Sequence, residues 1–376
     1  MQTASPMPEL TNALLDAKAF PAKLLYQFSD LTAEDQRELA KLWPRIPLER
    51  RRNLLKDLTE LADSDNLMDF TAVGRTALND EDTDVVCGGI DLLFSAEDKK
   101  LIPVFLKLLK DRERSEFIRA SAANALGPYV FLGEMEELRP EILQEMEEDL
   151  LNAYTQDPSG LVQRRALESL GYSSREEVPA LLRKAIDHPT PQWVESALFA
   201  MAKSADEQWE ADVMEHLDDP NQDVRLQAIL AAGSLNLSKA RKPLLKLLSP
   251  KEDNDLRKEA IWALSQIGGE GVMEAFLRLQ ERSQDDEELN LLEEALDTLN
   301  FTNDSGLYEL MDYNAEEGGH MHAEDDSEDE DPEGPDYDEW EEYLDEDGEP
   351  RDDEEDEEAA YFDNEDLEDD FAEDEF

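Results

Sequence analysis

The chain has 376 residues, 96 of them acidic and 35 basic, which gives a formal charge of −61 at pH 7. Carboxylates and phosphates repel one another, so this charge excludes direct binding of nucleic acid. The single cysteine, Cys87, excludes an internal disulfide framework, and no apolar run reaches the roughly 18 residues of a membrane-spanning helix. We therefore expect a cytoplasmic protein that does not enter the membrane.

The first 66 residues predict a helical unit of their own. Thr32 stands before an acidic first turn, as an N-cap residue does, and Pro47 is suited to the start of a second helix. Neither helix has the small central residue that recurs further along the chain. We expect residues 1–66 to form an N-terminal cap over the open end of a helical stack.

Residues 67–302 contain a helical pattern that recurs seven times. An apolar anchor is followed four positions later by Gly or Ala, then by small or aliphatic residues at the seventh and eighth positions. The small residues lie 31 to 35 residues apart, with one interval of 44. The anchors are Val85, Ile118, Val162, Trp193, Val224, Leu256 and Leu291. A period of this length is typical of a solenoid, and the small residue lets a second helix approach closely.

A second leucine-rich segment stands before most of these helices. Pro103, Pro140, Pro179 and Pro243 lie near the starts of these segments, where a helix tolerates proline. One amphipathic helix cannot bury its own apolar stripe, so each repeat is interpreted as two antiparallel helices. The pattern predicts an all-α fold, a right-handed α-solenoid of about seven helix pairs.

The phrases NQDVRLQAILAAGSL and NDLRKEAIWALSQIGG resemble the short HEAT-like repeats first named after phycobilisome lyases. The resemblance covers about three fifths of the chain and implies architecture more than chemistry. It also implies a ladder of Asp and Arg side chains between repeats. Asp223 with Arg225 fits that ladder best, Asp255 with Arg257 also fits, and Arg119 has the arginine without the preceding aspartate.

The interval of 44 residues contains the segment GPYVFLGEMEELRP. Its glycines and proline interrupt the helical pattern, and an apolar cluster falls where a turn is expected. Long connections on a rigid scaffold often carry function, so Tyr129 and Phe131 are candidate partner contacts. The alternative is that both rings cover neighbouring helices or that the segment extends a helix.

Catalytic and metal-binding motifs are missing from the sequence. The chain has four histidines, and none belongs to an HExxH or His-Asp cluster. His188 and His216 stand at different distances from their anchors, which argues against a shared ligand site. Cys87 lies on the repeat stripe, where a buried thiol is expected more often than a nucleophile. We expect no enzyme activity, no cofactor and no metal.

Residues 303–376 predict a disordered acidic tail. From Asp304 onward, 38 acidic residues stand against one basic residue, Arg351. Neighbouring charges repel, and too little apolar surface is present to offset the entropy of ordering. Aromatic side chains are interleaved with the acids and are candidate contacts to a basic partner: Tyr337, Trp340, Tyr343, Tyr361, Phe362 and Phe371.

The sequence favours a non-enzymatic protein-binding scaffold. Exposed positions just after the anchors are expected to meet the partner: Arg164, Arg165, Glu195, Gln227, Lys258 and Glu293. One alternative is a chaperone or decoy that binds basic proteins through the acidic tail. A second is bilin lyase-like activity, which the repeat family includes; the negative charge of the solenoid disfavours it, because a bilin carries propionates.

Overall fold

The computed structural model describes residues 5–300 except 17, 66, 95, 97 and 250–252, and this part of the chain is helical with no strand. The N-terminal helices are α1 (Met7–Leu15), α2 (Ala33–Leu42), α3 (Leu48–Ser64) and α4 (Thr71–Ala77). Short 3₁₀ helices cover Ala22–Phe28, Trp43–Arg45, Lys99–Leu101, Glu207–Trp209 and Ser238–Ala240. No helix in the described ranges is both long enough and apolar enough to cross a bilayer.

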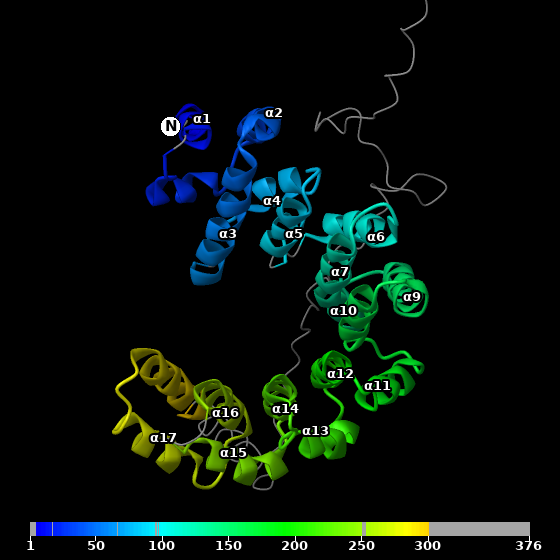
Figure 1. Cartoon of the computed structure of the whole chain (residues 1–376), viewed down its shortest axis with the longest axis vertical. Coiled ribbons are helices and arrows are strands. Elements are labelled where there is room, and N and C mark those ends of the chain that lie inside the picture. Colours follow the sequence, from blue (N-terminus) through cyan, green and yellow to red (C-terminus); the bar gives the residue numbers. More distant parts are fainter. Residues whose placement is uncertain are drawn as a thin grey trace, which may run out of the picture. The chain divides into compact units, whose positions relative to one another are not determined.

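After α4 the helices alternate between two layers, the A helices and the B helices (Figure 1). The A helices are α6 (Ile102–Lys110), α9 (Pro140–Gln156), α11 (Val178–Ile186), α13 (Glu210–His216), α15 (Arg241–Leu247) and α17 (Val272–Gln280). The B helices are α5 (Thr83–Leu92), α7 (Glu116–Ala125), α10 (Gly160–Leu170), α12 (Pro191–Lys203), α14 (Gln222–Ser234), α16 (Asn254–Ile267) and a last helix over 286–300. Each B helix from α5 to α14 packs on the next, so the all-α solenoid of helix pairs is confirmed.

Four of the B helices, α5, α7, α14 and α16, are capped by a residue three positions before the anchor. Asp82, Ser115, Asn221 and Asp253 all accept a hydrogen bond from the backbone N–H of the anchor that follows. These side chains satisfy donors that the first helical turn leaves without partners. The anchors then enter the core, and the small residues four positions later, such as Ala122, are completely buried.

Neighbouring B helices also approach closely at a second position, nine residues after the anchor, which was not predicted from the sequence. A Cβ added at Gly171 would lie 2.6 Å from the Cα and O atoms of Ala200 on the next B helix. At Gly233 it would lie 2.8 Å from the Cα of Ala263. Because glycine has no side chain, the backbone of α12 packs directly against Gly171 at the end of α10, and the backbone of α16 packs directly against Gly233 on α14.

The N-terminal helices share one core with the start of the stack. That core includes Phe28 and Leu58 together with Val85 on α5. Asp80 accepts a hydrogen bond from Trp43 Nε1 at 2.8 Å and pairs with Arg51, across the boundary expected at residue 66. The division of the chain at 66 and 302 stays a prediction.

The ladder of charged side chains differs from the expected one. Arg119 donates two hydrogen bonds of 3.0 Å to Asp157 of the following repeat, and both side chains are buried. Arg225 instead donates to the backbone oxygen of Asp219 at 2.7 Å, and Arg257 pairs with Glu288 of the next repeat. Ion pairs between repeats are therefore present at Arg119 and Arg257, with acids other than the expected ones. Asp223 and Arg225, which were expected to fit the ladder best, form no ion pair with a neighbouring repeat among the described residues.

The segment after α7 forms a helix, α8 (Gly127–Glu134), in place of the expected turn. The ring of Tyr129 is 2% exposed, and its hydroxyl donates to the backbone oxygen of Ala96 at 2.8 Å. Tyr129 is thus a core residue, and its assignment as a partner contact is wrong. Phe131 lies on the same helix and is 47% exposed, so it remains a predicted partner contact.

Candidate partner-binding surface

The B helices pack on one another in a single layer (Figure 1). The face of this layer that points away from the A helices is here called the B surface, and side chains on it are called outward. Successive residues are rotated by about 100° in a helix, so the sixth position after an anchor lies opposite the buried stripe. On α12 this position is Phe199, on α14 Leu230 and on α16 Trp262. Positions two and three after the anchor flank this line.

The six charged or polar residues expected on this surface all lie on B helices outside the buried core. Arg164, Arg165, Glu195, Gln227 and Lys258 are partly exposed and Glu293 is exposed. Arg165 pairs with Glu168 on its own helix, and Lys258 pairs with Glu287. The role of these six residues in partner binding stays a prediction. A partner that binds Arg165 or Lys258 would have to compete with the ion pair that each of them already forms.

A row of large apolar side chains runs along the B surface and was not recognised from the sequence. The row consists of Phe131, Tyr172, Phe199, Leu230 and Trp262. The rings of Phe131 and Tyr172 are 5.9 Å apart between centroids, which joins α8 to the end of α10. These five side chains are here called the apolar row. Phe131 is exposed on α8, and the other four are partly exposed, with Tyr172 just after α10 and the rest on B helices. For Phe199, Leu230 and Trp262 the available signal was a large apolar residue at the sixth position after the anchor, since helix geometry places that position opposite the buried stripe.

The ammonium group of Lys203 lies over two rings of the apolar row. Its Nζ is 5.6 Å from the centroid of Tyr172 and 5.1 Å from that of Phe199. An aromatic face attracts a cation because its quadrupole is negative above the ring. The pair of rings therefore already accommodates a positively charged group.

Two carboxyl groups border the row in partly desolvated positions. Burial raises the pKa of Glu195, and the charge of Asp223 adds to the effect. Burial likewise raises the pKa of Glu259, with a further contribution from the charge of Asp255. Neither glutamate forms an ion pair with a described basic residue closer than 4.0 Å.

The raised pKa values predict a pH-dependent effect of Glu259→Gln. A carboxyl whose folded-state pKa is raised stabilises the fold below its unfolded pKa, and that contribution is lost as the pH rises through the folded pKa. At neutral pH, Glu259→Gln is expected to raise the melting temperature above that of Glu274→Gln, an exposed control with the same charge change on α17. Scanning calorimetry at decreasing pH should show this advantage vanish as the wild-type carboxyl becomes protonated; an advantage independent of pH would contradict the desolvation.

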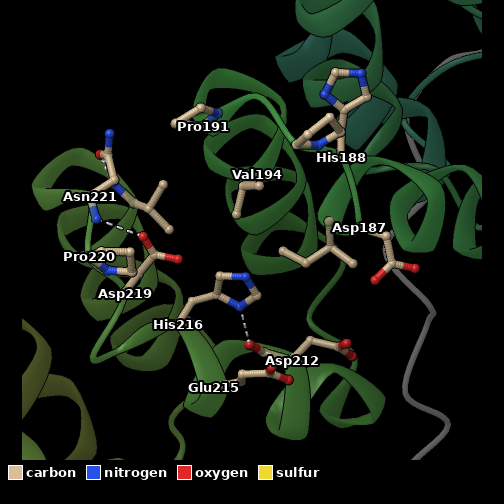
Figure 2. Close-up of a pocket in the computed structure, with 13 residues that line it drawn as sticks. Asp187, His188, Pro191, Val194, Asp212, Glu215, His216, Asp219, Pro220 and Asn221 are labelled. Carbon is tan, nitrogen blue, oxygen red and sulfur yellow. Dashed lines mark hydrogen bonds between the residues drawn. The ribbon is translucent and has the colours of Figure 1, made fainter.

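A hollow between two repeats, apart from the B surface, is lined by both histidines of the solenoid (Figure 2). His216 Nδ1 is 2.8 Å from the backbone oxygen of Asp212, so this nitrogen donates. His188 Nδ1 accepts from the N–H of Thr190 at 3.1 Å, and its ring packs on Trp193. His188 reaches this hollow from the loop before α12 and His216 from the end of α13. The expectation that the two histidines do not share a ligand site stays a prediction. No group of three His, Cys, Asp or Glu side chains in the described part of the chain is arranged to hold a metal ion.

The aromatic contacts predicted at Tyr337, Trp340, Tyr343, Tyr361, Phe362 and Phe371 lie outside the described residues. The thiol of Cys87 is partly buried on α5, and burial raises its pKa, which disfavours the reactive thiolate.

Comparison with known proteins identifies the repeats. Residues 210–297 match the family described as HEAT repeats. No curated protein matches the chain. The match identifies residues 210–297 as HEAT repeats, and the helix pairs before them stack in the same two layers.

Solved structures of similar architecture have low sequence identity to the chain. YibA of E. coli is 18% identical, with 76% of this chain and 98% of YibA covered, at a TM-score of 0.41. The complex of CpcE and CpcF of phycocyanin lyase from Nostoc is 19% identical, with coverages of 61% and 94%, also at 0.41. Human deoxyhypusine hydroxylase is 19% identical, with coverages of 72% and 97%, at 0.33.

Proposed function

We propose that the protein is a non-enzymatic scaffold that binds a partner protein along the B surface. The observation that carries this proposal is the apolar row, which places Phe199, Leu230 and Trp262 on three consecutive B helices. Aromatic and apolar side chains in the centre of a surface supply most of the binding energy in protein interfaces. We also propose a cytoplasmic location, supported by the low cysteine content.

The B surface also fits a long contact better than a compact ligand. The members of the apolar row come from separate repeats, each of which packs only on its neighbours. HEAT-repeat solenoids generally bind protein partners, and such a row presents one contact per repeat. This arrangement favours an extended segment of a partner protein, and not a small molecule, as the ligand of the B surface.

The test is capture of partners from the native cell extract with the full-length chain and with Phe199→Ser. Loss of a central apolar contact is expected to cost about 1–2 kcal/mol and to reduce partner recovery at least several-fold. Leu277→Ser is the matched control, because Leu277 is 47% exposed on α17, an A helix. Equal recovery with both variants would overturn the proposal, and equal melting temperatures would show that neither variant acts through unfolding.

A second candidate function is supported by the charge of the acidic tail. The segment from Asp304 carries 38 acidic residues and one basic residue, with aromatic residues between them. Such a segment suits a chaperone or decoy for basic proteins, in which charge drives the encounter. Deletion of the residues after Asp304 separates the two functions. If the deleted chain no longer captures the partner, and moderate salt also abolishes capture by the full-length chain, the acidic tail is the binding element. If the deleted chain still captures the partner, the B surface is the binding element.

A further inference from the structure

We propose that the partner segment held by the B surface is basic and amphipathic, and that its cationic side chains lie over the stretch from α14 to helix 286–300. The inference rests on the proposed function and adds the chemistry of the partner. Two separate features of the described residues support it, the charge of this stretch and the position of Lys203.

The outward positions of these three helices are strongly acidic. Asp223 and Asp255 stand one residue before their anchors and are exposed, and Glu259 lies one turn further along α16. Helix 286–300 adds three outward acids, and with Asn290 they line a shallow hollow: Glu293, Glu294 and Asp297. The one basic side chain at an outward position here, Lys258, is already paired with Glu287.

Apolar contacts lie within the same stretch. Leu230 and Trp262 are partly exposed on α14 and α16, the helices that carry Asp223, Asp255 and Glu259. Trp262 is supported from beneath by Gly233, whose missing side chain leaves room for the indole ring. A segment that alternates apolar and cationic side chains would satisfy both kinds of contact, because its charges would reach the carboxylates while its apolar groups cover the indole and Leu230.

The position of Lys203 shows how a cation binds to the part of the apolar row that contains Tyr172 and Phe199. Its ammonium lies over Tyr172 and Phe199, so these rings attract a cation, and a cation of the partner could replace that of Lys203. A basic segment must compete with Lys203 or be repelled by it. Removal of this charge should therefore strengthen the binding of a basic segment and weaken that of an acidic one.

The experiment uses the full chain and a fluorescein-labelled 16-residue peptide of lysine, leucine and serine that carries a benzophenone group. Two further peptides replace each lysine by glutamate or each leucine by serine. Dissociation constants are measured by fluorescence anisotropy, and photo-crosslinked residues are mapped by mass spectrometry. The variants are Glu259→Gln/Glu294→Gln, Lys203→Gln and the control Glu274→Gln/Glu281→Gln, which makes the same charge change at and just after α17.

The expected result is that the lysine–leucine peptide crosslinks to α14, α16 or helix 286–300. Its affinity should fall about twofold to fivefold per removed carboxylate and rise by a similar factor in Lys203→Gln, with no such loss in the control. Tighter binding of the glutamate peptide, equal binding of the serine peptide, or crosslinks confined to residues after 303 would overturn the inference. If Phe199→Ser still abolishes partner capture in that case, the proposed function stands and only the chemistry of the partner is wrong.

Discussion

Asp157→Ala is expected to destabilise the solenoid more than any other substitution considered, by about 3–5 kcal/mol, because it leaves a buried guanidinium without its partner. Asp157 is nearly inaccessible and accepts from Arg119 on α7 and from the backbone N–H of Ser159 at 2.9 Å. The charge of Arg112 reaches the same carboxylate. The contact joins two repeats, so its loss should weaken the stack at that junction. Chemical denaturation followed by circular dichroism measures the change.

The control for this prediction is Asp218→Ala, in the exposed loop after α13, with an expected change within about 0.5 kcal/mol. A double variant, Arg119→Leu/Asp157→Leu, should recover much of the loss, since a buried pair can be replaced by apolar groups at little cost. A double variant as unstable as Asp157→Ala would show that the pair itself, and not the unpaired charge, determines the stability.

The pH dependence of the same substitution has a defined sign. Burial raises the pKa of Asp157, but the hydrogen bonds from Arg119 and from the Ser159 N–H, with the nearby arginine charges, outweigh it and lower the pKa overall. A lowered folded-state pKa gives stability that is present above the unfolded pKa and is lost as the pH falls through the folded value. The difference between wild type and Asp157→Ala should therefore shrink in acid below the ordinary aspartate range.

Gly171→Ala is expected to destabilise the protein by about 1–3 kcal/mol, the range for overpacking in a close-packed interior. Gly171 has helical dihedral angles, φ −58° and ψ −23°, so alanine fits its backbone conformation. The obstacle is the backbone of Ala200, 2.6 Å from the new Cβ, which moves only if α12 shifts away from α10. Thermal unfolding of the purified variant measures the loss.

Gly160→Ala provides a control on the same helix. Gly160 begins α10, and a Cβ at this position would have no atom within 4 Å. Alanine has a higher helix propensity than glycine, so this variant should be stabilised by a few tenths to about 1 kcal/mol. If Gly171→Ala lowers the free energy of unfolding and Gly160→Ala raises it, the close approach of α12, and not helix propensity, explains the effect at Gly171. Changes of the same sign in both variants would contradict this explanation.

The repeat pattern alone was sufficient to predict the helix pairs. Anchors such as Val224 and small residues such as Ala228 are spaced by the helical period, and burial of that stripe requires a second helix. Distant partners were harder to predict. Arg119 finds Asp157 in the next repeat, 38 residues away, and such a pairing depends on how repeats stack, which the spacing within one helix does not encode.

The B surface was predicted only in part for a similar reason. Glu195 and Lys258 were expected there because they follow the anchors, but Phe199 and Trp262 were overlooked, since apolar residues on a repeat helix suggest core. Their outward position follows from the angle around the helix. The contact of Lys203 with two rings also joins different B helices and needs coordinates to be seen.

The most direct measurement of partner binding along the B surface is site-specific photo-crosslinking in the native cell. Leu230→p-benzoylphenylalanine places the crosslinker in the middle of the apolar row, and Leu277→p-benzoylphenylalanine places it on the A helix α17. A partner band at position 230 that is absent at position 277 is the predicted result. Identical bands at both positions, or none at 230 while the folded protein still captures its partner, would contradict the account.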